Sequence, residues 1–100
     1  MVRLIRLKVY NQGREVLVAA CDAELLGQTL REGELRLEVK PDFYDGVAAD
    51  REQLLRHLRL ATIGNFVGEE TVTAALEGGF IEEGGIIRIN GVPHAQMVVL

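Results

Sequence analysis

The chain has 100 residues, of which 48% are hydrophobic and 26% are charged, and its net charge at neutral pH is −4. This length and composition predict one globular domain with one core over residues 1–100, and they exclude a disordered chain. The single cysteine excludes an internal disulfide and fits a reducing cytoplasm. The first residues lack the apolar core of a signal peptide, and no apolar run is long enough to cross a bilayer. We therefore expect a cytoplasmic protein with no membrane partner.

Positive charge is concentrated at the start of the chain. Residues 1–14 contain no acid and four bases, which are Arg3, Arg6, Lys8 and Arg14. Acids outnumber bases over the rest of the chain. Because non-specific nucleic-acid binding depends on neutralising phosphates, an acidic chain is a poor candidate for it. The basic first strand nevertheless remains a candidate local contact for RNA.

Alternating side chains predict a first strand over residues 3–10, and turn residues separate it from the apolar run 15–21. This run has no polar face, so we expect a strand that is buried on both sides and forms a hairpin with the first. Asp22 is expected to cap a short helix over residues 22–26, and Gly27 is expected to end it in the left-handed conformation.

Strict alternation predicts a half-exposed strand over residues 34–40, and the turn-rich segment 41–46 follows it. This region combines basic side chains on the exposed face of the strand with two aromatic side chains in the loop. Loop aromatics can stack on bases or anchor a partner protein. The alternative is that the rings fold back over the core while the bases pair with neighbouring acids. The candidate binding residues here are Arg36, Lys40, Phe43 and Tyr44.

Two helical segments are predicted between residues 51 and 77. Asp50 and Gln53 fit a capping box at the start of the first, and apolar positions at helical spacing follow. The second is expected over residues 69–77. Gly64 interrupts the pattern between them, which leaves open whether the region is two helices or one bent helix.

The C-terminal part predicts a hairpin of strands 86–90 and 94–100, because Asn90-Gly91 is a strong signal for a tight turn. Pro93 lacks an amide proton, so we expect the last strand to begin at a sheet edge or a bulge. Together the elements predict an α+β fold of about five mostly antiparallel strands, with two or three helices packed on one face.

Several segments, in order along most of the chain, together resemble an archaeal family known only as domain-of-unknown-function family 424. The resemblance implies a small stand-alone protein, and it supplies no activity and no catalytic or binding residue. The segments that carry it are Ala19-Ala20-Cys21-Asp22 with Glu24-Leu25-Leu26-Gly27, Leu37-Glu38-Val39 running to Phe43-Tyr44, Ala61-Thr62-Ile63-Gly64-Asn65 with Val67-Gly68-Glu69, and Gly91-Val92-Pro93-His94-Ala95-Gln96.

Cys21 and His94 are the candidate catalytic residues. A thiol just before a helix N-terminus can be activated, and a nearby imidazole would complete a nucleophile–base pair. The alternative is a buried structural cysteine and a hydrogen-bonded strand histidine. With His57, these side chains lack the paired spacing of a zinc site, so we expect no metal and no cofactor.

Asn65 lies among apolar residues, so its amide needs partners either in the fold or in a ligand. The sequence favours a non-enzymatic binding module for RNA or a ribonucleoprotein, with a role in translation as the working guess. Arg3, Arg6 and Lys8 join the loop aromatics as its contacts. One alternative is a small enzyme or ligand-binding protein that uses Cys21 and His94. The other is a homodimer paired through residues 94–100, where an apolar strand invites pairing.

Overall fold

The computed structural model describes residues 4–100 and shows an α+β fold. Its main sheet has six strands in the order β5-β1-β2-β6-β8-β7, and β3 and β4 form a separate two-stranded sheet. The strands are β1 (Ile5–Gln12), β2 (Glu15–Asp22), β3 (Thr29–Glu32), β4 (Leu35–Glu38), β5 (Val47–Ala49), β6 (Ile63–Val67), β7 (Ile87–Ile89) and β8 (Val92–Val98). The helices are α1 (Pro41–Tyr44), α2 (Arg51–Leu58) and α3 (Glu69–Glu77), with single 3-10 turns at η1 (Ala23–Leu25) and η2 (Glu83–Gly85).

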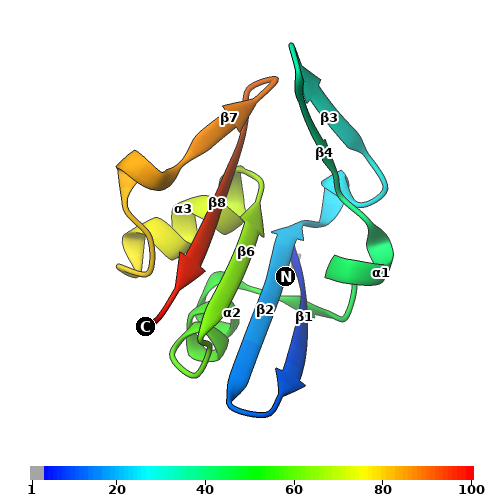
Figure 1. Cartoon of the computed structure of the whole chain (residues 1–100). Coiled ribbons are helices and arrows are strands. Elements are labelled where there is room, and N and C mark those ends of the chain that lie inside the picture. The colour runs from blue at the N-terminus through cyan, green and yellow to red at the C-terminus, as the bar shows by residue number, and fades with distance from the viewer. Residues whose placement is uncertain (1–3) are drawn as a thin grey trace.

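Two helices, α2 and α3, cover one face of the main sheet, and Figure 1 shows both behind β2, β6 and β8. Alternate residues of each strand point towards these helices, because successive side chains of a strand point to opposite faces. The α+β class is confirmed, and these two helices pack on one face as predicted, whereas α1 lies on the other. The largest fully buried side chains of the core between sheet and helices are Ile5, Leu7, Val18, Leu54, Leu58 and Phe66.

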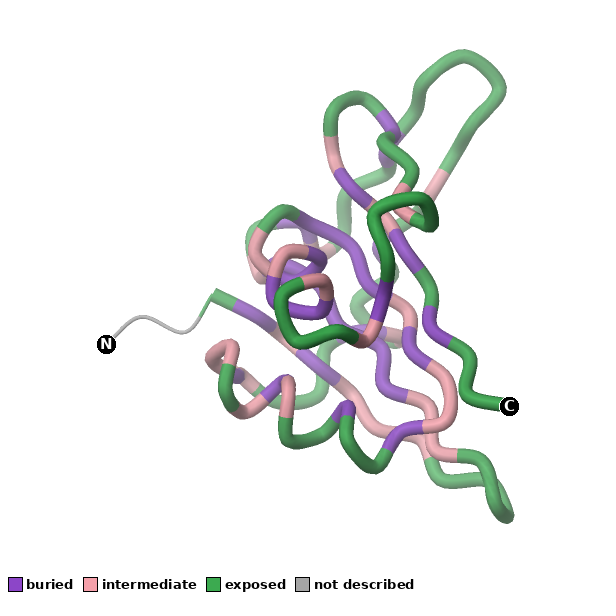
Figure 2. The backbone as a smooth tube through the Cα atoms, turned by 90° about the vertical axis from the view of Figure 1, so that its left-hand side faces the viewer, coloured by how far each residue is buried: buried purple, intermediate pink, exposed green. Residues whose placement is uncertain are grey.

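The opposite face of the sheet has a smaller core at one end only. Here Cys21 and Val67 are covered by Leu25 of η1, Leu30 of the β3–β4 hairpin, Val39 after that hairpin and Tyr44 of α1. Figure 2 shows that buried positions follow the strands of the main sheet, whereas the tip of the β3–β4 hairpin is exposed. The strand β2 is therefore buried on both sides from Val18 onward, which confirms the prediction for that part of the run, whereas residues 15–17 are exposed or half-buried.

The region between α2 and α3 differs from the expectation. Residues 63–67 form β6, a central strand that is parallel to β2 and antiparallel to β8. Residues 51–77 thus contain two helices, which is one of the two alternatives left open, but the segment between them is a strand that was not predicted. Gly64 does not act as a helix breaker: a Cβ there would lie 2.4 Å from the Phe66 ring, so the glycine leaves room for that ring in the core.

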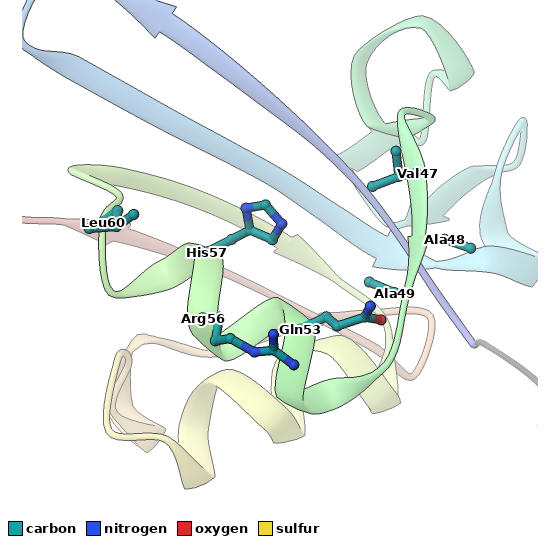
Figure 3. A pocket seen from close by; sticks show the side chains of 7 residues that line it. All are labelled: Val47, Ala48, Ala49, Gln53, Arg56, His57 and Leu60. Carbon is teal, nitrogen blue, oxygen red and sulfur yellow. The ribbon is translucent and has the colours of Figure 1, made fainter.

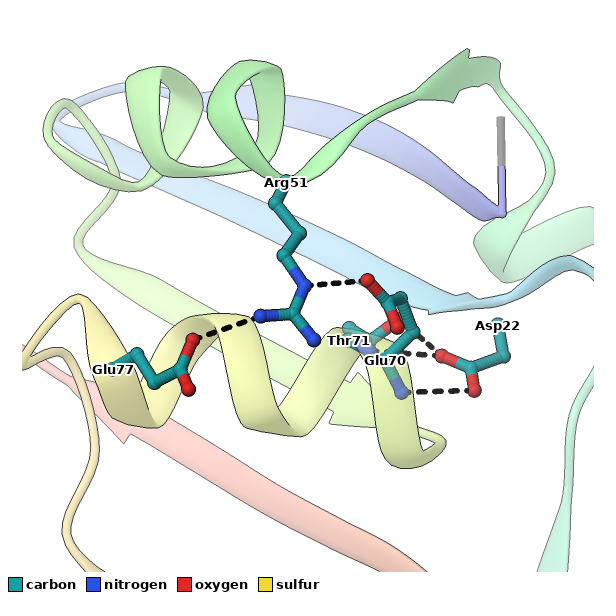
Figure 4. A network of polar contacts seen from close by, with 5 residues as sticks. All are labelled: Asp22, Arg51, Glu70, Thr71 and Glu77. Atoms are coloured by element: carbon teal, nitrogen blue, oxygen red, sulfur yellow. Dashed lines mark hydrogen bonds and ion pairs between the residues drawn. The ribbon is translucent and has the colours of Figure 1, made fainter. Parts of the chain in front are cut away.

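Asp22 caps a different helix from the one predicted. It makes no capping bond to η1, which is a 3-10 turn. Its carboxylate instead accepts bonds from the Glu70 and Thr71 amides at 3.1 and 2.9 Å, and from the Thr71 hydroxyl at 2.8 Å (Figure 4). Gly68, with a φ of 111°, turns the chain between β6 and α3 where a Cβ would meet Asp22 at 2.3 Å. The N-terminus of α3 is therefore occupied by a carboxylate from β2.

The capping box of α2 is confirmed: Asp50 accepts from the Gln53 amide, and Gln53 accepts from the Asp50 amide. An ion-pair cluster then ties α2 to α3. Arg51 donates to Glu70 and, at 2.8 Å, to Glu77 (Figure 4). The hydrogen bond between Arg51 and Glu70 raises the pKa of the arginine and lowers the pKa of the glutamate.

Three smaller predictions need correction. The strand expected over 34–40 ends at Glu38, and the turn-rich segment after it contains the helix α1. Pro93 lies at neither an edge nor a bulge, because β8 lies between β6 and β7 and Pro93 pairs with Arg88. The proline is tolerated because the pairing of β8 with β6 begins only at the next residue, His94. The amide proton that Pro93 lacks is therefore not needed for that pairing. The turn at Asn90-Gly91, where both φ angles are positive, is confirmed.

Candidate functional site

The face of the main sheet opposite α2 and α3 carries the candidate site, and we call it the open face. Strand pairing places Tyr10 beside Leu17, Leu17 beside Ile63, and Ile63 beside Val98. Paired residues point to the same face, so these four side chains form a row across β1, β2, β6 and β8. We call it the apolar row. Its side chains are half-buried or exposed, in contrast to the covered end of the same face.

An aromatic pair stands over one end of the apolar row. The rings of Tyr10 and Phe43 are stacked with centroids 5.5 Å apart, and the Tyr10 hydroxyl donates to the Phe43 carbonyl at 2.8 Å. These contacts hold α1 against β1. Beside the pair is a mostly apolar pocket of about 340 Å³, which we call the aromatic pocket. Its lining residues are Tyr10, Gln12, Glu15, Leu17, Phe43 and Ile63.

A second row, next to the apolar one, is polar. Strand pairing aligns Lys8, Ala19, Asn65 and Gln96. The Tyr44 hydroxyl donates to Asn65 Oδ1 at 2.7 Å, which fixes the amide, and the Asn65 nitrogen pairs with no described residue. Burial raises the pKa of Tyr44, so its hydroxyl keeps its proton and acts as the donor. The open face therefore presents amide groups beside the apolar row.

The basic residues predicted for the site are largely engaged within the fold. Arg6 Nε lies 2.7 Å from Asp45 Oδ1. Lys8 Nζ donates to the Asp42 carbonyl at 2.9 Å and lies 5.3 Å from the centre of the Tyr10 ring. These contacts stabilise α1 and reduce the charge that is free for a ligand.

The remaining predicted contacts lie away from the aromatic pocket. Arg36 is on the separate β3–β4 hairpin and pairs with Glu38 at 3.8 Å. Lys40 is exposed at the start of α1, where its carbonyl accepts from the Phe43 and Tyr44 amides. Arg3 lies outside the described residues. The structure thus brings Arg6, Lys8, Phe43, Tyr44 and Asn65 together, and it does not bring Arg36 to them.

Cys21 and His94 share a row but do not meet. Cys21 pairs with Val67, and Val67 pairs with His94, so two strand spacings, about 10 Å, separate their backbones. Burial, and next the charge of Asp22, raise the pKa of Cys21 to about 12. His94 Nδ1 donates to the Phe66 carbonyl at 2.9 Å, which assigns Nε2 as the acceptor of the neutral ring. The arrangement provides no nucleophile–base pair.

A second hollow, of about 340 Å³, lies between β5 and α2 (Figure 3). One imidazole and one guanidinium are among its lining groups, and the guanidinium of Arg56 lies 3.8 Å from Glu52. Among the residues that the structure describes, no group of three or more metal-binding side chains is placed to hold a metal ion. The lining residues are Val47, Ala48, Ala49, Gln53, Arg56, His57 and Leu60, and none of them belongs to the predicted site.

Sequence reasoning missed most of the apolar row. The sequence predicts Leu17 in a buried strand and Val98 in a strand that invites pairing, and it assigns no role to Ile63 or Gln96. Their shared face depends on the register of four strands, three of which are joined only by long connections. The alternation in β1 and β8 was a usable signal, but it could not assign neighbours to these strands.

The fold and the site define a small α+β protein with helices on one face of a six-stranded sheet and an open face with an aromatic pocket. The family described as "Protein of unknown function (DUF424)" matches residues 10–100, and the chain belongs to this family. The resemblance noted from the sequence is confirmed. Among residues 4–100, no helix has the length and apolar character needed to cross a membrane.

A solved structure supports the fold. The crystal structure of an uncharacterized conserved protein from Methanopyrus kandleri is similar to this chain with a TM-score of 0.82 and 28% sequence identity. The match covers 96% of this chain and 91% of that one. None of the curated proteins compared with the chain matches it.

Proposed function

We propose that the chain is a non-enzymatic binding module that holds a single-stranded segment of RNA, alone or within a ribonucleoprotein, on its open face. The aromatic pocket carries this proposal. A stacked pair of rings beside an apolar floor suits a nucleobase, because every base has a flat face that stacks on aromatic side chains. Helices on one side of a sheet and accessible aromatics on the other also occur in RNA-recognition modules.

The surroundings of the pocket fit the rest of a nucleotide. The amides of Asn65 and Gln96 lie in the neighbouring row, where they can bond to base edges. Arg14 is exposed in the β1–β2 turn beside the pocket and can contact a phosphate, as Lys8 can from the other side. With about two phosphate contacts, log K should fall with log salt at a slope of only about −1.4. Stacking, rather than charge, is then the main source of affinity.

Fluorescence anisotropy with a labelled pool of random single-stranded RNA tests the proposal. Leu17→Glu places a charge on the floor of the pocket, and we expect it to weaken binding at least about tenfold. Leu60→Glu is the matched control, since Leu60 is 78% exposed and lines the other hollow. It should leave the affinity unchanged. No binding by the wild-type chain at low salt, or equal losses in the two variants, would contradict the proposal.

A further inference from the structure

The strand β8 has one fully paired edge and one edge that is half unpaired. On one side, residues 94–98 of β8 pair with the whole of β6. On the other side, β7 has only three residues and pairs with residues 92–94. Within residues 4–100, no strand continues along β8 from Ala95 to Val98 on that side.

The hydrogen bonds at the two ends of β8 show which backbone groups are left over. The Pro93 carbonyl accepts from the Gly68 amide at 2.9 Å, and the Val99 amide donates to the Thr62 carbonyl at 2.8 Å, both on the β6 side. Alternate residues of a strand direct their N–H and C=O groups to the same side. Gln96 and Val98 therefore direct theirs to the outer side, where no described residue pairs with them.

The side chains do not protect this edge. Residues 95–100 contain no charged side chain and no proline. Val98 is 64% exposed and Val99 is 57% exposed. Sheet edges are usually blocked by lysines, prolines, bulges or a covering element, because an unpaired edge is a template for another strand. Here those devices are missing, although Pro93 stands just before the unpaired stretch.

We propose that two copies of the chain pair through this edge, antiparallel, to form a dimer with one continuous sheet. A second copy fits because the pairing is self-complementary. With Met97 opposite Met97 of the second copy, Gln96 and Val98 form hydrogen-bonded pairs with Val98 and Gln96 of that copy, and each pair exchanges two bonds. An uncharged edge also brings no repulsion between identical copies.

The outer side of β8 has room for the end of the incoming strand. A pocket of about 310 Å³ lies where β7 begins, and it is lined by Gly85, Ile87, His94, Ala95 and Gln96. In this register, the residue after Val98 of the second copy lies opposite Ala95, beside that pocket. Its side chain then points, like that of Ala95, to the side of the sheet that the helices cover. This pairing does not depend on the RNA proposal.

Sedimentation velocity over a concentration series of the whole chain tests the proposal. The wild-type chain should show a reversible monomer–dimer equilibrium. Val98→Pro removes one outward N–H and no bond within the chain, so it should raise the dissociation constant at least about tenfold. Val98→Ala keeps the N–H and should change the constant much less. A wild-type chain that stays monomeric at every concentration, or a Val98→Pro variant that dimerises as tightly, would overturn the proposal.

Disulfide trapping tests the register. A mixture of Gln96→Cys and Val98→Cys chains should cross-link under mild oxidation, because hydrogen-bonded partners lie about 5.5 Å apart, within reach of a disulfide. Each variant alone should not, since its cysteines would be offset diagonally by about 7–8 Å. Cys21 is fully buried and does not interfere. Cross-links in the separate variants but not in the mixture would overturn this register.

Discussion

The environment of Cys21 determines its chemistry more than its position before a turn does. The side chain is 0% exposed between β1 and β6, under the small core of the open face. Burial and the neighbouring carboxylates raise its pKa to about 12, against about 8.5 for a free thiol. The helix dipole that could have lowered this pKa is absent, since only the short turn η1 follows.

This shift predicts a loss of stability at alkaline pH. A raised pKa in the folded chain gives a contribution that is complete below the pKa of the unfolded thiol, about 8.5, and is lost as the pH rises towards 12. Between about pH 9 and pH 10 the free energy of unfolding should fall by up to about 1.4 kcal/mol. Urea denaturation at both pH values measures it. Cys21→Ala should remove most of this fall, and equal falls in the two proteins would contradict the assignment.

At the scale of elements, the two caps of the long helices are held very differently. Asp50 caps α2 through a local box, whereas Asp22 reaches α3 from β2, across 48 and 49 residues of sequence. Asp22 is only 5% exposed, and its carboxylate receives two amides and one hydroxyl. Asp22 thus links the end of β2 to the N-terminus of α3, the helix that follows the neighbouring strand β6.

Replacing the two caps should therefore have unequal effects. Asp22→Ala leaves three donors without a partner in a buried place, so we expect a loss of about 2–4 kcal/mol in the free energy of unfolding. Asp50→Ala, the matched control, should cost about 1 kcal/mol, because water can reach its half-buried cap. Chemical denaturation of both variants measures this difference. Equal losses would mean that the bonds of Asp22 add little beyond an ordinary cap.

Local signals in the sequence predicted the elements that local interactions determine. The Asn90-Gly91 turn, the capping box at Asp50 and the bounds of α3 needed no knowledge of distant residues. The strands β3 and β5 were missed because their three or four residues carry too little periodicity, whereas the equally short β4 and β7 were found from the alternation around β4 and the tight turn after β7. The strand β6 was missed because Gly64 and Asn65 have low strand propensity, and packing against Phe66 and pairing with two neighbours override it.

The candidate site also combines features that local sequence predicts with features that depend on distant residues. The aromatic loop was visible as Phe43 and Tyr44, because turn residues and rings are local features. The partner ring of Tyr10, and the floor that Leu17 and Ile63 supply, depend on which strands become neighbours. The predicted positive charge was real in the sequence, but the pairing of Arg6 with Asp45 became visible only in three dimensions.

At the scale of the whole molecule, the two proposals make one joint prediction. A two-fold axis through the β8 edges places both open faces on the same side of one sheet. Five strand spacings, about 24 Å, then separate the two copies of Leu17 across the sheet. An RNA strand long enough to reach both pockets should gain affinity from effective concentration, whereas a short one should not.

Comparison of a tetranucleotide with a much longer strand, by anisotropy above the dissociation constant of the dimer, tests this link. The wild-type chain and Val98→Ala should bind the longer strand at least about tenfold more tightly. Val98→Pro should bind both with the affinity of one pocket, because it keeps the aromatic pocket and loses the second copy. An equal gain in Val98→Pro would show that length acts within one copy. The dimer would then play no part in binding, even if each proposal held by itself.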